Sequence, residues 1–217
     1  MTIKCTFLFL PALLLISTLD LFSQSDWELK MNKEGITVYT KNLENSPYKA
    51  IKTVCTIKSS MSRLTAVLLD IENSADWVYS TKKCSVLKVS SPTDLTYYSE
   101  IAVPWPVSNR DFIIRLKVSQ DEKTKVVTVL GENKPTYLPE NKNVVRIQRS
   151  FSKWLITPLP NGLLKIEYLL EVDPGGTIPA WLINMFATKG PFETFKNLRE
   201  QVKKPRYDKV TLAFINN

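Results

Sequence analysis

Two charged side chains stand out in a stretch of the chain that otherwise has the pattern of two buried β-strands, residues 95–103 and 110–119. Glu100 lies in the first strand and Arg115 in the second, and a Pro104-Trp105-Pro106 corner separates the strands. Because side chains alternate across a strand, both charges are expected on the inward face. Buried charges are costly unless they pair or meet a polar guest. The pattern predicts a cavity with Glu100 and Arg115 at its polar end, and an internal salt bridge that only steadies the strands is the alternative.

The residue types give little support for catalysis. The chain contains no histidine, which is the commonest acid–base group in enzymes. No nucleophile–base pair, paired carboxylates or metal-ligand spacing stands out. Glu100 could act as a desolvated base, but an adjacent Arg115 would lower the pKa of its carboxyl group. We predict a binding protein without catalytic residues, metal or cofactor, and keep an enzyme that acts on a hydrophobic substrate as the alternative.

The chain is basic, with 29 Lys and Arg against 21 Asp and Glu and a net charge of +8. Lysines are scattered over most of the strand-like segments, which is typical of a solvated surface. A second interpretation is attraction to an anionic membrane surface or to an anionic ligand. Nucleic acid is not an expected partner, because the basic residues do not cluster in a recognisable module.

The N-terminus has the pattern of a leader. Lys4 supplies a positive start, residues 7–16 form an apolar run, and small and polar residues follow. The run is too short to cross a bilayer comfortably. We predict a signal peptide over residues 1–23 and an exported protein, periplasmic or extracellular after cleavage. An uncleaved N-terminal anchor is the alternative. Export permits a disulfide, but buried free thiols are favoured for Cys55 and Cys84, which lie in separate strand-like runs.

The rest of the chain has the pattern of one domain over residues 24–205, followed by a short tail over 206–217. A lead-in at residues 26–30 is expected to be helical or extended. Alternating polarity and turn residues predict strands at 36–41, 48–58, 84–90, 95–103, 110–119, 125–132, 144–156 and 163–172. No role is predicted for the apolar residues of the tail.

Three helices are expected. Ser60 can cap a helix over residues 61–70, and a short helix over 72–77 carries Trp77 inward. Apolar residues at three- and four-residue spacing predict a long helix over residues 178–202, capped by Thr177 and kinked or interrupted at Gly190-Pro191. The elements predict an α+β fold in which a long curved antiparallel sheet wraps around the C-terminal helix, with two short helices inserted early.

Several motifs carry a family resemblance when their order and spacing are taken together. The opening Trp27–Tyr39 segment, the Tyr98-Ser99-Glu100 strand, Pro104-Trp105-Pro106, Ser108–Phe112 and Asp173–Asn184 cover nearly all of the predicted mature chain. The chain resembles a START (StAR-related lipid-transfer) domain, with the helix-grip fold of the Bet v 1-like superfamily. The middle motifs resemble the phosphatidylcholine-transfer branch most closely, and the last is similar to the start of the family's C-terminal lid helix.

The resemblance implies a non-enzymatic tunnel that encloses one lipid or sterol-like molecule between the sheet and the C-terminal helix. Such a protein would carry, transfer or sense its ligand, would touch membranes transiently and would be a monomer. A cyclase-like enzyme of the same superfamily and an interaction module with a solid core are the alternatives.

The resemblance also implies roles for individual residues. Arg115 matches the family's cavity arginine, and Glu100 lies on the strand that supplies an acidic partner in some members. Arg110 and Asp111 are expected to fix the corner between the strands. The remaining expected ligand-facing residues belong to the lid helix or are aromatic, and ordinary packing against the sheet is the alternative for those of the helix. They are Met185, Thr188, Phe192 and Phe195 of the helix, with Tyr98, Trp105 and Trp154 lining the tunnel or forming an aromatic cage for a quaternary ammonium.

Overall fold

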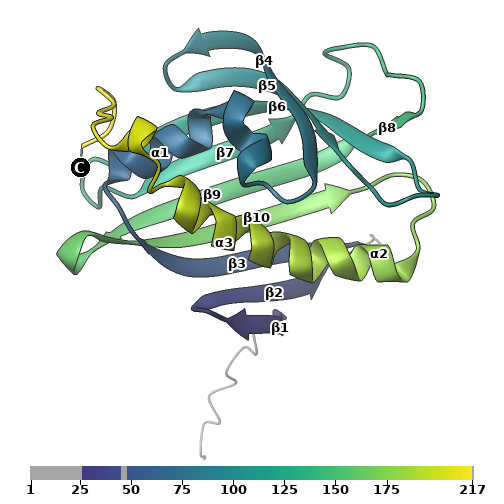
Figure 1. Cartoon of the computed structure of the whole chain (residues 1–217), viewed down its shortest axis with the longest axis horizontal. Helices are drawn as coiled ribbons and strands as arrows, with labels where there is room; N and C mark the ends of the chain where they lie inside the picture. The colour runs from purple at the N-terminus through teal and green to yellow at the C-terminus, as the bar shows by residue number, and fades with distance from the viewer. Residues whose placement is uncertain (1–25, 45–47, 217) are drawn as a thin grey trace, which may run out of the picture.

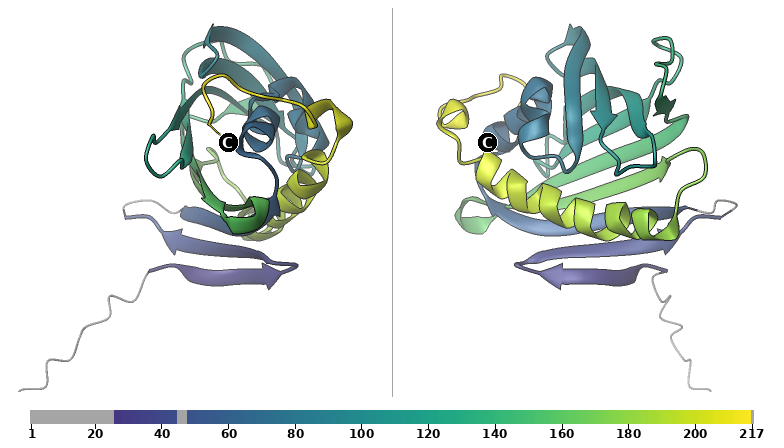
Figure 2. Two further views of the ribbon diagram at one scale, coloured as in Figure 1. Left: turned by 90° about the vertical axis from the view of Figure 1, so that its left-hand side faces the viewer. Right: turned by 45° about the vertical axis from the view of Figure 1, so that its right-hand side comes forward.

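The computed structural model describes residues 26–44 and 48–216. The predicted signal peptide therefore lies outside the described residues. The described part of the chain forms one sheet of ten strands, and the C-terminal helical segment lies along the open side of this curled sheet (Figure 1). Figure 2 shows the same curl from two further directions, with the short helices of residues 61–76 close to the last part of the chain.

Neighbouring strands along the sheet are antiparallel, in the order β1-β2-β3-β10-β9-β7-β6-β5-β4. The short β8 lies off this path and pairs with β6 in parallel. The predicted α+β fold with a long antiparallel sheet is confirmed. The strands are β1 (Glu28–Lys33), β2 (Ile36–Asn42), β3 (Lys49–Lys58), β4 (Thr81–Ser91), β5 (Asp94–Ile101), β6 (Asn109–Gln120), β7 (Val127–Asn133), β8 (Val144–Arg146), β9 (Arg149–Leu159) and β10 (Leu163–Asp173).

The lead-in at residues 26–30 was expected to be helical or extended, and its residues 28–30 belong to strand β1. One strand prediction needs correction, because the single strand expected over 144–156 is divided into β8 and β9. The division follows from a change of partner strand, because residues 144–146 pair with β6. The Ile147 N–H donates a further hydrogen bond to β6, to the carbonyl of Asp111 at 2.9 Å. The chain then turns to join β10 and β7 as strand β9.

The early helices agree closely with the sequence. Helix α1 (Met61–Leu69) begins after Ser60, whose hydroxyl accepts a hydrogen bond from Arg63 N–H at 3.2 Å. A 3₁₀ turn (Ile71–Asp76) follows and places Trp77 in the interior, as predicted.

The C-terminal helix differs in detail from its prediction. It runs through α2 (Ala180–Asn184), a π-helical turn (Met185–Lys189) and α3 (Gly190–Gln201) without a break. Its start follows Pro179, and Thr177 does not cap it. Gly190 keeps a helical φ of −56°, so the predicted interruption at Gly190-Pro191 is wrong and the irregularity lies in the preceding turn.

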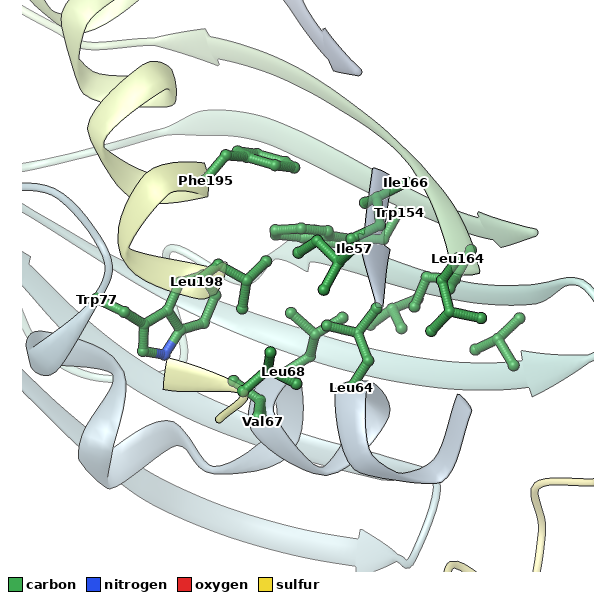
Figure 3. Close-up of a cluster of buried hydrophobic side chains, with 14 of the residues drawn as sticks. Ile57, Leu64, Val67, Leu68, Trp77, Trp154, Leu164, Ile166, Phe195 and Leu198 are labelled. Atoms are coloured by element: carbon green, nitrogen blue, oxygen red, sulfur yellow. The ribbon is translucent and has the colours of Figure 1, made fainter. Parts of the chain in front are cut away.

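The hydrophobic core fills the space where α1, the end of α3 and the sheet meet. Figure 3 shows side chains from all three converging there, among them Leu64 of α1, Leu198 of α3 and Ile166 of β10. Each of these three side chains is fully buried. The core therefore anchors the C-terminal half of the helical segment, whereas α2 lies toward the other end of the sheet (Figure 1).

Residues 206–216, expected as a tail without a role, pack on this core. Tyr207 and Ile215 are buried, and the Tyr207 hydroxyl donates to the Asp70 carboxylate at 2.7 Å. Asn216 exchanges hydrogen bonds with the Gln120 side chain at 2.7 and 2.8 Å. The segment thus covers the α1 end of the domain.

Candidate functional site

A cavity of about 320 Å³ lies between the sheet and the C-terminal helical segment. This volume falls at the lower end of the range of small-molecule sites, about 300–1,000 Å³. Its walls are mostly apolar and come from both layers. The helical segment contributes Leu182, Ile183, Phe186, Ala187, Pro191 and Phe195, and the strands contribute Ile51, Phe112, Ile114, Leu116, Val129 and Leu170 among others.

One wall of the cavity is aromatic. Trp154 stacks on Phe195 with ring centroids 5.3 Å apart and lies 4.3 Å from the Tyr168 ring centroid. Trp77 meets Trp154 edge-on at 6.3 Å. Trp154 and Phe195 therefore line the cavity, as the sequence predicted. Stacked and edge-on rings gain about 0.5–1.5 kcal/mol each beyond the burial of their area, which makes this wall rigid.

The other three residues of the C-terminal helix that were expected to face the ligand do not line the cavity. Met185, Thr188 and Phe192 are absent from the lining, and Phe192 instead lies beneath the ammonium groups of Lys33 and Lys196. Cavity-lining residues recur every four positions, from Leu182 and Ile183 through Phe186 and Ala187 to Phe195. An α-helix turns every 3.6 residues, so a four-residue repeat drifts unless a wider turn compensates. The π-helical turn supplies that compensation.

The predicted pair of Glu100 and Arg115 does not form. Glu100 accepts hydrogen bonds from Lys82 at 2.8 Å and from Asn109 at 2.7 Å. Arg115 donates to Asp94 at 2.9 Å. The hydrogen bond from Lys82 lowers the pKa of Glu100, and the one to Asp94 raises the pKa of Arg115.

Neither Glu100 nor Arg115 lines the cavity, because the inward face of these strands is shifted by one residue from the prediction. Tyr97, Ser99 and Ile101 of β5 line it, as do Phe112, Ile114 and Leu116 of β6. Both charged side chains therefore belong to the outer face of the sheet.

Tyr98 and Trp105 also lie away from the cavity. Trp105 is 91% exposed at the corner between β5 and β6. The Tyr98 hydroxyl lies on the outer face, where Asn141 donates to it at 3.3 Å. Burial, with the nearby Asp111 charge, raises the pKa of Tyr98 to about 12. The two residues are not placed with Trp154, so the aromatic cage predicted from these three residues is not assembled.

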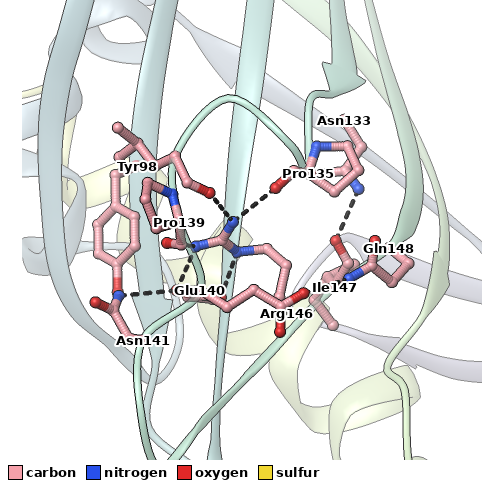
Figure 4. A network of polar contacts seen from close by, with 11 residues as sticks. Tyr98, Asn133, Pro135, Pro139, Glu140, Asn141, Arg146, Ile147 and Gln148 are labelled. Atoms are coloured by element: carbon pink, nitrogen blue, oxygen red, sulfur yellow. Dashed lines mark hydrogen bonds and ion pairs between the residues drawn. The ribbon is translucent and has the colours of Figure 1, made fainter.

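A polar network on this outer face is centred on Arg146, which Figure 4 shows among the carbonyls of Pro135 and Pro139. The network also includes an acid of β6, Asp111, that water does not reach. Arg146 donates to both oxygens of Asp111, at 2.7 and 3.1 Å, and each side chain is 1% exposed. Arg146 also donates to the carbonyls of Pro135, Leu138 and Pro139. The network holds residues 135–141 against the sheet. Asp111 thus holds the segment between β7 and β8, whereas it was expected to fix the corner between β5 and β6.

Arg110 was expected to fix the corner between β5 and β6, and its hydrogen bond to the Ser108 carbonyl does so. It also lines the cavity and is 5% exposed. Its guanidinium donates to the carbonyls of Ser108, Pro174 and Gly175. The large apolar residues Phe112, Ile114 and Leu116 share its face, and that alternation was the signal that could have revealed it.

Three polar atoms of the cavity wall have no hydrogen-bond partner within the described structure: Trp77 Nε1, Thr81 Oγ1 and Ser150 Oγ.

Cys55 and Cys84 are free thiols, as favoured from the sequence, and Cys84 lines the cavity with its sulfur 3.3 Å from Ser99 Oγ. Over residues 26–44 and 48–216, no group of three His, Cys, Asp or Glu side chains is arranged to hold a metal. The helices of that same part are too short or too polar to span a membrane.

Comparisons with known proteins agree with this architecture. A crystal structure of a StAR-related lipid transfer protein from Xanthomonas axonopodis superposes with a TM-score of 0.76 at 32% identity, over 82% of this chain and 99% of that one. The structure of human STARD10 is similar in fold, with a TM-score of 0.71 at 22% identity, over 87% of this chain and 78% of that one.

Sequence relatives point the same way. An uncharacterized protein of Pseudomonas aeruginosa is 35% identical over 82% of this chain and 88% of its own length. Mouse phosphatidylcholine transfer protein is 28% identical over 76% of this chain and 78% of its own length. The profile of the START domain matches residues 16–207. With its helix-grip fold and this match, the chain belongs to the START domain family, whose members bind lipids and other hydrophobic ligands.

Proposed function

We propose that the protein binds one lipid or similar hydrophobic molecule in the cavity between the sheet and the C-terminal helical segment, for carriage or transfer. The observation that carries this proposal is the apolar cavity itself, bounded by the Trp154–Phe195 stack and by the inward face of β6. The relatives with a named function reported above are lipid transfer proteins, which supports a carrier rather than an enzyme.

Burial of apolar surface supplies the driving force for binding. Each methylene group moved from water into such a cavity contributes about 0.8 kcal/mol. A few polar groups then set the orientation of the guest, as in most small-molecule sites. The cavity offers such groups, including the hydroxyls of Thr81 and Ser150.

The segment before α2 is the proposed gate through which a ligand enters the cavity. Gly175 and Gly176 both have positive φ, +66° and +64°, a conformation that other residues rarely adopt. They lie between β10 and the helical segment, where rotation of the backbone would lift α2. Gly190 is a poor hinge, because it is helical and a Cβ there would lie 3.2 Å from the Tyr79 ring.

We further propose that the same end of the molecule touches membranes. Trp105 is 91% exposed and Trp181, in the first turn of α2, is 52% exposed. Arg110 ties the two regions together by bonding the carbonyls of both Ser108 and Gly175. Tryptophan is enriched at membrane–water interfaces, and a net charge of +8 favours anionic surfaces.

Native mass spectrometry of the protein purified from its own host tests the proposal. We expect a bound lipid, which the same spectrum would identify after dissociation. A clean unliganded mass, together with no uptake of lipid from liposomes, would contradict the proposal and favour an interaction module without a ligand.

We also propose that the protein is exported to the periplasm or the extracellular space, on the basis of the leader-like residues 1–23. N-terminal sequencing after cell fractionation should find a chain that begins near Gln24. Recovery of the intact N-terminus from the cytosol would overturn this proposal.

A further inference from the structure

Arg110 is a buried cation at the wall of an apolar cavity. Its side chain projects from β6 on the same face as Phe112 and Ile114, and 5% of the residue is exposed. Moving a guanidinium from water into such a place is costly, unless a negative charge or a full set of hydrogen bonds compensates it. The contacts of Arg110 therefore decide whether its charge is already compensated.

The hydrogen bonds of Arg110 go to neutral groups only. Nε donates to the Pro174 carbonyl at 3.2 Å, one Nη to the Ser108 carbonyl, and the other Nη to the Gly175 carbonyl at 3.1 Å. A guanidinium has five N–H groups, so one N–H on each Nη atom is left over. No carboxylate of the described residues forms an ion pair with Arg110.

The second buried arginine provides an internal comparison. Arg146 also bonds three backbone carbonyls, but it additionally has the two oxygens of Asp111 at 2.7 and 3.1 Å. Each arginine thus donates hydrogen bonds to the backbone carbonyls of a loop, but only Arg146 also has an anion beside it. The hydrogen bonds of Arg110 to loop carbonyls do not explain why its positive charge lies at the cavity wall without an anion beside it.

The surroundings of Arg110 add further unused polar groups. Its neighbour across the strands is Ile101, which in turn lies opposite Thr81. Ser150 lies opposite Val172, two residues before Pro174. The Thr81 and Ser150 hydroxyls line the cavity without hydrogen-bond partners in the described structure. The end of the cavity nearest the Pro174-Gly175 loop therefore combines a cation with two hydroxyls that have no hydrogen-bond partner in the described structure.

We propose that Arg110 binds the anionic head group, a carboxylate or a phosphate, of an amphiphile whose apolar chain lies along the Trp154–Phe195 wall. This inference rests on the proposed function, since it assigns the head group of the ligand that the cavity holds. The two spare N–H groups of Arg110 suit bidentate bonding to a planar carboxylate or to two phosphate oxygens.

A ligand series with one chain and different heads tests the assignment on the wild-type protein. Hexadecanoate, hexadecyl phosphate and hexadecanol are titrated by calorimetry below the concentrations at which they aggregate. We expect one or both anions to bind about ten- to a hundredfold more tightly than the alcohol. The tighter anion then identifies the head-group class, carboxylate or phosphate.

The outcomes separate the two proposals. Equal binding of the alcohol and both anions would overturn the role of Arg110 and leave the proposed function standing. Absence of binding by all three, combined with no lipid uptake from liposomes, would overturn the proposed function itself.

Arg110→Met, which keeps much of the side-chain volume, should abolish the preference for anions and leave hexadecanol binding unchanged. Arg115→Met is the matched control, because it removes an arginine from the outer face of the same strand and should keep the preference. If Arg110→Met does not fold, Arg110→Lys retains the charge but loses the fork of donors, and its anion preference should fall severalfold. An unchanged preference in the foldable Arg110 variant would contradict the proposal.

Discussion

Asp111 and Arg146 form an ion pair through two hydrogen bonds of 2.7 and 3.1 Å, and each side chain is 1% exposed. Asp111 comes from β6 and Arg146 from β8, the strand that pairs with it in parallel. The pair thus locks the segment between β7 and β8 onto the outer face of the sheet, whereas Phe112 and Ile114 of β6 line the cavity on the inner face.

Arg146→Met should lower the free energy of unfolding by about 3–5 kcal/mol, because Asp111 would be left as a buried charge without its cation. Urea denaturation measures the change. Arg115→Met is the control, since its pairing with Asp94 is partly exposed and should contribute no more than about 1 kcal/mol. Combining Arg146→Met with Asp111→Leu should recover part of the loss. If Arg146→Met and Arg115→Met lowered the free energy of unfolding equally, the buried Asp111–Arg146 pair would be no more important for stability than the partly exposed Asp94–Arg115 pair.

Ala187→Phe should block ligand uptake, because Ala187 lines the cavity from the π-helical turn and a phenyl group would occupy the ligand's space. Overpacking costs about 1–3 kcal/mol, so affinity for a fluorescent lipid analogue should fall about tenfold or more. Thr188→Phe, one residue along and outside the lining, is the matched control and should leave affinity nearly unchanged. The reverse order of effects would indicate that the helix presents the face predicted from the sequence.

Trp105→Ala should weaken binding to vesicles that contain anionic phospholipid, measured by co-sedimentation, while the free energy of unfolding changes by no more than about 0.5 kcal/mol. The small effect on stability follows from the 91% exposure of Trp105. Val89→Ala is the control, since Val89 is also exposed but lies near the Ser91–Asp94 turn, at the other end of β4 and β5. Equal vesicle binding by both variants would argue against membrane contact through the Trp105 corner.

Stability should fall in alkaline solution, in part through Cys55. Burial raises the pKa of the Cys55 thiol to about 12, whereas an unfolded cysteine titrates near about 8.5. The folded state therefore holds this proton more tightly, and the stabilisation is fully present below about pH 8.5 and is lost as pH rises toward the folded pKa. The slope should reach about 1.4 kcal/mol per pH unit for this group. Cys55→Ala should flatten the unfolding free energy between about pH 8.5 and 10, and an unchanged slope would contradict the assignment.

The fold was largely accessible from the sequence because its signals were local. Ser60 caps α1 as expected, and turn residues marked most of the hairpins. The division of residues 144–156 was missed because it depends on a contact with Asp111, which lies far away in the chain. The π-helical turn was missed because a 3.6-residue periodicity contains no sign of a widened turn.

The site was predicted less well, and the reason is a one-residue shift on β5 and β6. Both faces of these strands are partly covered, the inner one by the cavity wall and the outer one by residues 135–141. The sequence of β6 nevertheless alternates, with Phe112 and Ile114 on the inner face and Arg115 on the outer one, so the signal for the inward face was present. Glu100 and Arg115 were assigned to the cavity because their charges were taken to face inward, whereas Trp154 and Phe195 do line it.

The pairing of β3 with β10 has a consequence for how the chain folds. Lys58 at the end of β3 lies opposite Leu163 at the start of β10, so the first three strands join the sheet only after nearly the whole chain is available. Closing so long a loop is slow, because its entropy is lost before the new contacts form. Until then the edge of β3 stays unpaired and open to chaperones. Such late closure would suit the export proposed above, in which the polypeptide would be threaded unfolded across a membrane.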